Sequence, residues 1–198
     1  MYPFFETIRY HDAQAENLFF HQQRVERTYF SKGKICKLNL LEIKFNEIPE
    51  ATNLTNSGVY KCRLSYDLDG NYSICFEPYS IRKIETFSLV EIGVNKYDHK
   101  YTDRNWINNA VAAVKTDDVI FTENGLIKDA SYTNIALFDG YKWITPKFPL
   151  LMGTKRAFLL REKQIIEQDI FVQQLIDFKK IKFINAMMHW DESPCIDL

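Results

Sequence analysis

The chain has 198 residues, which is enough for one large domain or for two small domains that share an interface. Its hydrophobic content of 46%, with 15 Phe and 11 Tyr, supplies the side chains of real cores and excludes a disordered chain. The formal net charge of −1 excludes an overall positive field that would attract nucleic acid or an anionic membrane. We therefore expect a folded protein with no nucleic-acid partner and no membrane partner.

Cysteine usage and the first residues of the chain predict a cytoplasmic protein. Cys36, Cys62, Cys75 and Cys195 show no paired C-x-x-C spacing. The chain starts with Met1-Tyr2-Pro3 and lacks the charged and apolar regions of a secretory leader. No apolar run approaches the roughly 20 residues of a membrane span. These features indicate a reducing compartment.

The first part of the chain alternates between strand and helix patterns and ends near Pro78–Ser80. Period-two alternation predicts the strands. An apolar stripe that follows Asn17, a plausible N-cap, predicts the helix, and Asp69-Gly70 predicts a turn. The elements are a strand over 4–10, a helix over 17–29 and a hairpin over 58–68 and 72–77.

The second part of the chain also mixes helix and strand patterns, with turns at Asn124-Gly125 and Asp139-Gly140. A polar loop over 95–100 separates its first strand from its first helix. The expected strands cover 81–92, 119–122, 135–138, 141–145 and 181–184, and the expected helices cover 103–114 and 155–162. The pattern predicts an α+β protein of two lobes.

Several motifs of known chemistry are absent, namely G-x-S-x-G, G-x-G-x-x-G and H-E-x-x-H. Gly153-Thr154-Lys155 lacks the glycine spacing of a nucleotide-binding phosphate loop. The histidines His11, His21, His99 and His189 are scattered, which is more typical of surface or core residues than of metal ligands. We therefore predict no metal site.

A series of short motifs is spread along nearly the whole chain. In chain order they are Phe5-Glu6-Thr7-Ile8-Arg9, His21-Gln22-Gln23-Arg24-Val25, His99-Lys100-Tyr101-Thr102-Asp103-Arg104, Glu123-Asn124-Gly125, Asp129-Ala130-Ser131-Tyr132-Thr133-Asn134, Thr145-Pro146, Gly153-Thr154-Lys155-Arg156 and Ile184-Asn185-Ala186-Met187. This series resembles class IV aminotransferases and aminodeoxychorismate lyases. The resemblance implies a two-lobed, D-amino acid aminotransferase-like enzyme of fold type IV, with a smaller lobe over 1–80 and a larger lobe over 81–198.

The resemblance implies pyridoxal 5′-phosphate as cofactor and Lys100 as the Schiff-base lysine. A primary amine is required there because it must first bind the cofactor and then, once displaced by substrate, carry a proton. Without the resemblance, a lysine in the run 95–100 would be interpreted as an exposed loop residue.

The resemblance also assigns residues to the cofactor ring. Asp129 falls at the position of a carboxylate, usually Glu, that lies by the ring nitrogen, and it is one methylene shorter. Arg104 falls at or near a position, commonly Tyr, that contacts the phenolic oxygen. Asn134 follows as a residue that positions the carboxylate, although an equally good alternative is that it stabilises a turn. An ordinary hairpin acid is the alternative for Asp129.

The cofactor phosphate is assigned to a second set of residues. Arg24 matches the phosphate-binding arginine, which suits a planar guanidinium, with a solvated helix arginine as the alternative. Backbone N–H groups of Gly153 and Thr154 at a helix start, and of Asn185 and Ala186 at a strand end, are expected to bind the same phosphate.

The sequence leaves several hypotheses open for the reaction that this chain catalyses. The chain begins almost at the F-E-x-x-R strand, whereas the family usually has a longer N-terminal segment with substrate contacts. Its short length and the ending Asn185-Ala186-Met187-Met188 favour a 4-amino-4-deoxychorismate lyase, which releases pyruvate and yields 4-aminobenzoate for folate synthesis. Transamination of a branched-chain or D-amino acid, and a cofactor-binding protein without catalysis, are the alternatives. The resemblance further implies a small-molecule amino substrate and a homodimer.

Overall fold

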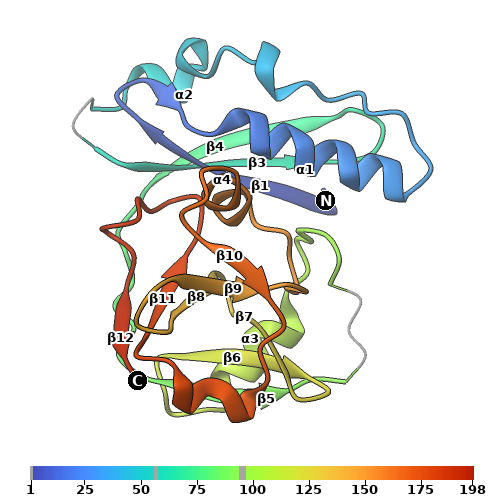
Figure 1. Ribbon diagram of the computed structural model, residues 1–198. Coiled ribbons are helices and arrows are strands. Elements are labelled where there is room, and N and C mark those ends of the chain that lie inside the picture. The colour runs from blue at the N-terminus through green and yellow to red at the C-terminus, as the bar shows by residue number, and fades with distance from the viewer. Residues whose placement is uncertain (1, 56–57, 94–96) are drawn as a thin grey trace. The chain divides into compact units, whose positions relative to one another are not determined.

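The chain folds into two compact units in a computed structural model that describes residues 2–55, 58–93 and 97–198. The first unit contains Met1–Ser80 together with His99–Asp103, and the second contains Ile81–Asp98 and Arg104–Leu198. The segment with Lys100 therefore belongs to the first unit, although it follows Ser80 in the sequence. Each unit has its own hydrophobic core, and Figure 1 labels the helices and strands that supply it.

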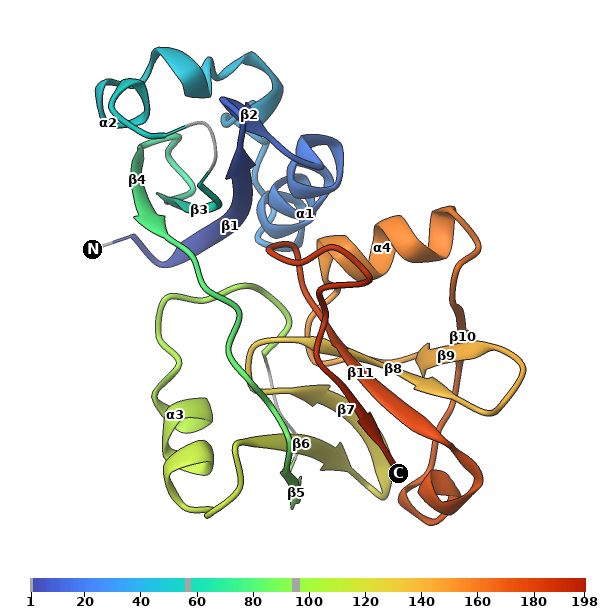
Figure 2. The ribbon, with the colours of Figure 1, turned by 90° about the vertical axis from the view of Figure 1, so that its left-hand side faces the viewer.

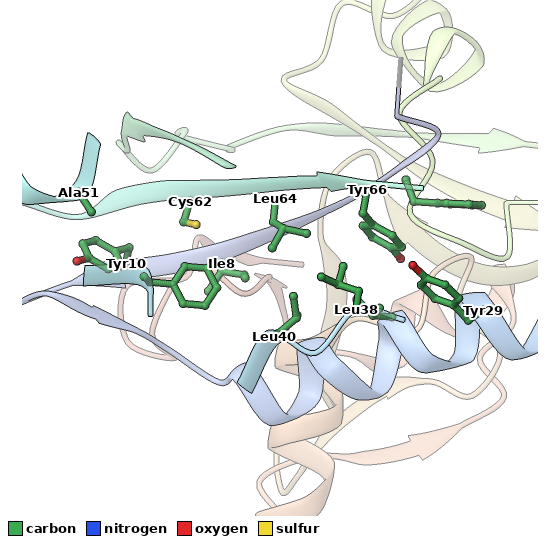
Figure 3. Packing of buried hydrophobic residues seen from close by; sticks show 12 residues of the cluster. Ile8, Tyr10, Tyr29, Leu38, Leu40, Ala51, Cys62, Leu64 and Tyr66 are labelled. Atoms are coloured by element: carbon green, nitrogen blue, oxygen red, sulfur yellow. The ribbon is translucent and has the colours of Figure 1, made fainter. Parts of the chain in front are cut away.

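The first unit is an antiparallel sheet with one long helix on one face. Its strand order is β2-β1-β3-β4, and Phe4 of β1 pairs with Tyr66 of β3. Side chains alternate along β1, so that one face packs Ile8 and Tyr10 into the core shown in Figure 3. The elements are β1 Phe4–His11, β2 Gln14–Ala15, α1 Leu18–Ser31, η1 Leu40–Glu42, η2 Phe45–Glu47, α2 Pro49–Thr52, β3 Tyr60–Tyr66 and β4 Tyr72–Pro78.

The start of α1 differs from the expected cap. Asn17 is at the N-cap position, but its backbone is left-handed, with φ 55 and ψ 28, and its side chain makes no capping hydrogen bond. The Asn17 carbonyl instead accepts the N–H groups of Phe20 and His21, at 3.0 and 3.3 Å. Asparagine tolerates this conformation better than most residues, which explains its place after the β2 turn.

The second unit contains two sheets. One has the order β5-β6-β7 and the other has the order β10-β9-β8-β11-β12. Helix α3 packs on β6 through Trp106 and Phe121, whose ring centroids are 5.0 Å apart (α3 and β6 are labelled in Figure 2). The elements are β5 Phe87–Glu91, α3 Asn105–Ala112, β6 Asp118–Glu123, β7 Leu126–Ala130, β8 Asn134–Phe138, β9 Trp143–Pro146, α4 Thr154–Arg161, β10 Ile166–Gln168, η3 Val172–Asp177, β11 Lys180–Ile184 and β12 Cys195–Asp197.

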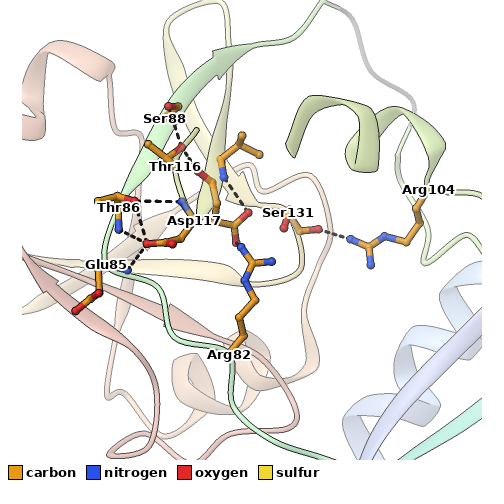
Figure 4. Close-up of polar contacts among 10 residues, drawn as sticks. Arg82, Glu85, Thr86, Ser88, Arg104, Thr116, Asp117 and Ser131 are labelled. Atoms are coloured by element: carbon orange, nitrogen blue, oxygen red, sulfur yellow. Dashed lines mark hydrogen bonds and ion pairs between the residues drawn. The ribbon is translucent and has the colours of Figure 1, made fainter. Parts of the chain in front are cut away.

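Two expected elements are longer in the prediction than in the structure. The strand expected over 81–92 is confined to β5, because Oδ2 of Asp117 accepts the backbone N–H groups of Glu85 and Thr86, both at 2.9 Å (Figure 4). These donors are therefore not available to a sheet. The helix expected over 103–114 covers Asn105–Ala112.

Parts of the chain carried no signal for a regular element. The short strands β2, β10 and β12, the helix α2 and the three 3₁₀ turns were not predicted. In the loop expected over 95–100, residues 95 and 96 lie outside the described residues. Among the described residues, no helix has the length and apolar character needed to cross a membrane.

Candidate functional site

A buried ion-pair cluster joins β1 to α1 in the first unit. Glu6 and His21 are both 0% exposed and Arg24 is 6% exposed. The Nε and Nη2 atoms of Arg24 donate to the two carboxylate oxygens of Glu6, at 2.8 and 2.5 Å. His21 Nδ1 lies 2.5 Å from Oε2 of the same carboxylate. Glu6 therefore accepts three hydrogen bonds from two residues and fixes the direction of the Arg24 guanidinium.

The contacts within this cluster determine the charge states of Glu6 and His21. Burial alone would raise the pKa of Glu6, but the charge of Arg24 and the hydrogen bonds from His21 and Arg24 outweigh it and lower the pKa to about 2. Burial lowers the pKa of His21, although its hydrogen bond to Glu6 opposes this. At neutral pH, Glu6 is thus an anion, and a neutral His21 must donate through Nδ1 because an ionised carboxylate only accepts.

Lys100 lies against β1 in the same unit. Its carbonyl accepts the backbone N–H of Phe5 at 3.1 Å, and its ammonium lies 4.7 Å from the centroid of the Phe5 ring. It is close enough to His21 to contribute to the lowered pKa of that imidazole. Lys100 is half-buried instead of being an exposed loop residue. The structure thus brings it together with the cluster of Glu6, His21 and Arg24.

The sequence interpretation missed Arg63. This half-buried residue of β3 stacks its guanidinium on the Phe5 ring at 3.8 Å, so that Phe5 has cations from both Arg63 and Lys100. Two neighbouring cations on this sheet are neutralised, since Lys61 pairs with Glu77 at 2.5 Å and Arg9 with Glu16 at 3.0 Å. Arg63 has no such ion pair among the described residues. An arginine within the alternating run of 58–68 was the available signal.

The second unit carries a buried carboxylate, Asp129, at the end of β7. One of its oxygens accepts Nδ2 of Asn134 at 2.8 Å, and the other accepts the backbone N–H of Leu151 at 2.9 Å. Asn134 also donates to the Leu151 carbonyl at 2.9 Å. Both protons of its amide are therefore used to join β7, β8 and the loop before α4. Asn134 is thus hydrogen-bonded both to the Asp129 carboxylate and to the loop before α4.

Burial controls the protonation of Asp129. Desolvation raises its pKa from 3.8 to about 6, while the hydrogen bonds from Leu151 and Asn134 limit the increase. The carboxylate is therefore mostly ionised at neutral pH but has an energetic preference for a cationic partner. A protonated ring nitrogen is a partner of this kind.

Helix α4 begins at a tightly packed glycine. Gly153 is its N-cap, and a Cβ atom on this residue would lie 1.8 Å from Oδ1 of Asn134. Only glycine fits beside the Asn134 amide, which explains its place in the motif. Thr154 is 2% exposed at the first turn, where helix N–H groups favour an anion.

A turn after β11 holds the remaining predicted phosphate residues. Asn185 accepts the backbone N–H of Met187 through Oδ1 at 2.8 Å, and its carbonyl accepts the N–H of Met188 at 3.4 Å. The side chain of Asn185 thus shapes the turn that presents Ala186.

Arg104 lies at the start of α3, where its Nη2 donates to the Ser131 carbonyl (Figure 4). Its Nε atom is buried and has no hydrogen-bond partner among the described residues, and the same holds for Oγ1 of Thr133. Thr133 lies in the turn between Asp129 and Asn134, and Arg104 donates to the Ser131 carbonyl of the same turn. Buried donors of this kind are rare unless a ligand or water satisfies them.

Comparison with known proteins gives a family for this arrangement. The profile described as amino-transferase class IV matches residues 95–190. An uncharacterized Haemophilus influenzae protein is 36% identical over 191 residues, which cover 94% of this chain and 98% of that protein. A crystal structure of a provisionally assigned 4-amino-4-deoxychorismate lyase from Haemophilus somnus has a TM-score of 0.86 and 33% identity, and covers 94% of this chain and 97% of that chain. The chain belongs to the class IV aminotransferase family.

Class IV aminotransferases are pyridoxal-phosphate enzymes, and the predicted fold type is confirmed. A provisionally assigned amino-acid aminotransferase from Mesorhizobium loti has the same fold, with a TM-score of 0.83, 19% identity and full coverage of both chains. The residues of this class IV chain fit the cofactor by their chemistry. Arg104 Nε and Thr133 Oγ1 are buried polar atoms that ligand oxygens can satisfy, and Asp129 is a buried carboxylate suited to a cationic ring nitrogen.

Proposed function

We propose that this class IV enzyme releases pyruvate from 4-amino-4-deoxychorismate and yields 4-aminobenzoate. The observation that carries the proposal is the likeness, at 33% identity and over 97% of its length, to the Haemophilus somnus protein that is provisionally assigned this activity. The substrate has a primary amine that can replace a lysine amine on the cofactor, and carboxylates that suit a cationic site. An enzyme of this kind would supply folate synthesis.

Residues of the first unit have three roles in this proposal. Lys100 would bind the cofactor covalently and, once the substrate amine has replaced it, would take the proton from the amine-bearing carbon and pass it to the departing enolpyruvate, which leaves as pyruvate. Arg24 donates to the cofactor phosphate from a guanidinium whose direction Glu6 fixes. Arg63 binds a substrate carboxylate, which is supported by its cation-π contact with the same Phe5 ring that Lys100 contacts.

Residues of the second unit serve the cofactor itself. When bound, the cofactor supplies an electron-withdrawing ring that stabilises negative charge at the substrate carbon. Asp129, held by Asn134, keeps the ring nitrogen protonated, and Arg104 favours an ionised phenolic oxygen. Backbone N–H groups of Gly153, Thr154, Asn185 and Ala186 neutralise the phosphate without a basic overall charge.

Transamination is the second candidate function, and a fold likeness favours it. The provisionally assigned amino-acid aminotransferase from Mesorhizobium loti covers this chain completely at 19% identity. The same scaffold can direct the same cofactor to either reaction by changes in the substrate pocket. A branched-chain or D-amino acid would be the substrate in that case.

The proposal includes a cytoplasmic location and a homodimeric state. A cytoplasmic location is supported by the absence of paired cysteine spacing, since the described cysteines Cys36, Cys62, Cys75 and Cys195 are all free thiols. A homodimer follows from the family resemblance. Light scattering of the purified protein gives twice the 23.4 kDa chain mass if this is correct and the single mass if it is not.

Borohydride trapping tests the cofactor lysine. Protein incubated with pyridoxal phosphate is expected to gain visible absorbance, and reduction followed by peptide mapping should place the cofactor on Lys100. The variant Lys100→Ala should gain no such absorbance. Lys44→Ala, which removes an exposed lysine paired with Glu47, is the matched control and should behave as the wild type. Labelling of any lysine other than Lys100 contradicts the proposal.

Product analysis separates the two reactions. A lyase releases pyruvate from 4-amino-4-deoxychorismate with no amino acceptor, and a lactate dehydrogenase assay detects it. A transaminase converts amino acids into keto acids and leaves the cofactor in its amine form until a keto acid is added. Keto acid formation from an amino acid panel, with no pyruvate from aminodeoxychorismate, would replace the lyase proposal by the second candidate.

A further inference from the structure

His99, the residue before Lys100, joins the lysine segment to the end of α1. Its ring is 7% exposed, and its Nε2 atom lies 2.7 Å from Oγ of Ser31, the last residue of α1. The ring is perpendicular to Phe4 at a centroid distance of 6.1 Å and contacts Tyr101 at 5.8 Å. Neither the resemblance nor the proposed function gives this histidine a role.

The direction of this hydrogen bond follows from proton counting. The Ser31 hydroxyl has one proton, and Oγ of Ser31 donates it to the carbonyl of Thr28 at 2.9 Å. The contact with His99 can then be satisfied only if Nε2 of His99 carries a proton and donates it to Oγ of Ser31. A neutral His99 in this tautomer and a charged His99 both meet this condition.

The backbone at Lys100 is bonded to β1 and also forms a tight turn, in which Tyr101 N donates to the His99 carbonyl at 3.0 Å. The Lys100 carbonyl accepts from Phe5 N at 3.1 Å, and Thr102 N donates to the Pro3 carbonyl at 2.8 Å. A three-residue turn restricts the backbone angles of its central residue, which is Lys100 here. In this turn His99 and Tyr101 contact Phe4, whereas Lys100 contacts the ring of Phe5. Fixing the His99 ring therefore fixes the direction of the Lys100 side chain.

We propose that His99, through its hydrogen bond to Ser31, is a positioning residue that holds the amine of Lys100 in its reactive direction. The inference rests on the proposed role of Lys100. Helix α1 would then hold two groups of the site, because it carries Arg24 and also anchors the lysine segment through Ser31. One rigid element would then set the position of both groups relative to each other.

The test is the rate at which added pyridoxal phosphate becomes attached to Lys100 in cofactor-free protein, followed by visible absorbance and confirmed by borohydride trapping. His99→Phe retains the packed ring but removes the donor, and Ser31→Ala removes the acceptor. Each is expected to lower this rate and kcat by about 10-fold or more, with KM and the equilibrium affinity for the cofactor within about threefold of wild type. A general loss of structure would change the affinity as well.

A rescue variant and a double variant test whether loss of the hydrogen bond between His99 and Ser31 causes the slower reaction. His99→Gln places an amide N–H near the position of Nε2 and should recover the rate to within about threefold of wild type. The double variant Ser31→Ala with His99→Phe should be no slower than either single variant, because both remove the same contact. Tyr101→Phe, which removes only the exposed hydroxyl that accepts from Lys32 at 3.3 Å, is the matched control.

The possible outcomes are distinguishable. Wild-type protein that cannot be trapped at Lys100 overturns the proposed function and this inference together. Wild-type protein that is trapped at Lys100, with His99→Phe and Ser31→Ala reacting at the wild-type rate, overturns this inference alone. Additive slowing in the double variant also overturns it, since independent effects would not arise from one shared hydrogen bond.

Discussion

Arg24 uses the Nε and Nη2 atoms of its guanidinium to bind both oxygens of Glu6, at 2.8 and 2.5 Å. This bidentate contact places two of the three guanidinium nitrogens on one carboxylate. The net charge of the pair is zero. The pair therefore adds no net positive charge with which Arg24 could neutralise a phosphate dianion.

The first prediction concerns Glu6→Gln. The folded-state pKa of Glu6 is lowered from 4.5 to about 2, so its ionised form stabilises the fold above pH 4.5 and this stabilisation is lost as the pH falls toward 2. At pH 7 the variant should lose about 3 kcal/mol in the free energy of unfolding, since the Arg24 charge stays buried. Urea unfolding at pH 7 and at lower pH measures this difference. Glu16→Gln, at the partly exposed pair with Arg9, should lose less than about 1 kcal/mol.

The second prediction concerns Asp129→Asn and has the opposite sign. The folded-state pKa of Asp129 is raised from 3.8 to about 6, so stability is present below pH 3.8 and is lost as the pH rises through 6. Without cofactor, the wild type should therefore lose about 3 kcal/mol of stability relative to the variant between pH 4 and pH 8, because only the wild type has a carboxyl group at this position to titrate. The catalytic rate of the Asp129→Asn variant should be lower than that of the wild type. Asp139→Asn is the control, because hydrogen bonds from the Lys142 and Tyr141 backbone lower the Asp139 pKa and predict a loss of stability at pH 8.

The third prediction concerns Gly153→Ala. A Cβ atom there would lie 1.8 Å from Oδ1 of Asn134, so the amide must move and release Asp129. We expect a loss of about 1–3 kcal/mol in unfolding free energy and weaker cofactor binding, measured by chemical unfolding and cofactor titration.

Two further variants check the cause of the Gly153→Ala effect. Gly93→Ala, where no atom of the described residues beyond its chain neighbours lies within 4 Å of the added Cβ, should stay within about 0.5 kcal/mol of wild type. Combining Gly153→Ala with Asn134→Ala should cost less than the sum of the single changes, because the shorter side chain removes the clash. Strict additivity would show that Asn134 is not the obstacle.

The fourth prediction concerns Arg63→Met. Loss of the guanidinium that stacks on Phe5 should raise KM for a carboxylate substrate about 10- to 100-fold and leave cofactor affinity unchanged, as removing a charged hydrogen bond does. Steady-state kinetics with a separate cofactor titration measure the two effects. Lys61→Met is the matched control on the same strand, since Lys61 is already paired with Glu77. A weakened affinity for the cofactor would move Arg63 from substrate to cofactor binding.

Local sequence patterns predicted the elements whose causes are local. The period-two alternation over 58–68 and the Asp69-Gly70 turn became β3 and β4, and Gly70 has the positive φ, +98, that the turn requires. Asn124 and Gly125 likewise both have positive φ, at 52 and 76, between β6 and β7. The strand expected over 81–92 was too long because the Asp117 side chain, distant in sequence, takes the N–H groups of Glu85 and Thr86.

By itself, the sequence determined the family, the cofactor class and the order of the motifs, since these depend on residue types and spacing along the chain. Tertiary structure alone decided that Lys100 is paired with β1 of the first unit, that Glu6 occupies half of Arg24, and that Arg63 shares the Phe5 ring with Lys100. Each of these facts is a contact between residues far apart in the chain. Such contacts depend on how strands and helices pack in three dimensions, and no local spacing encodes them.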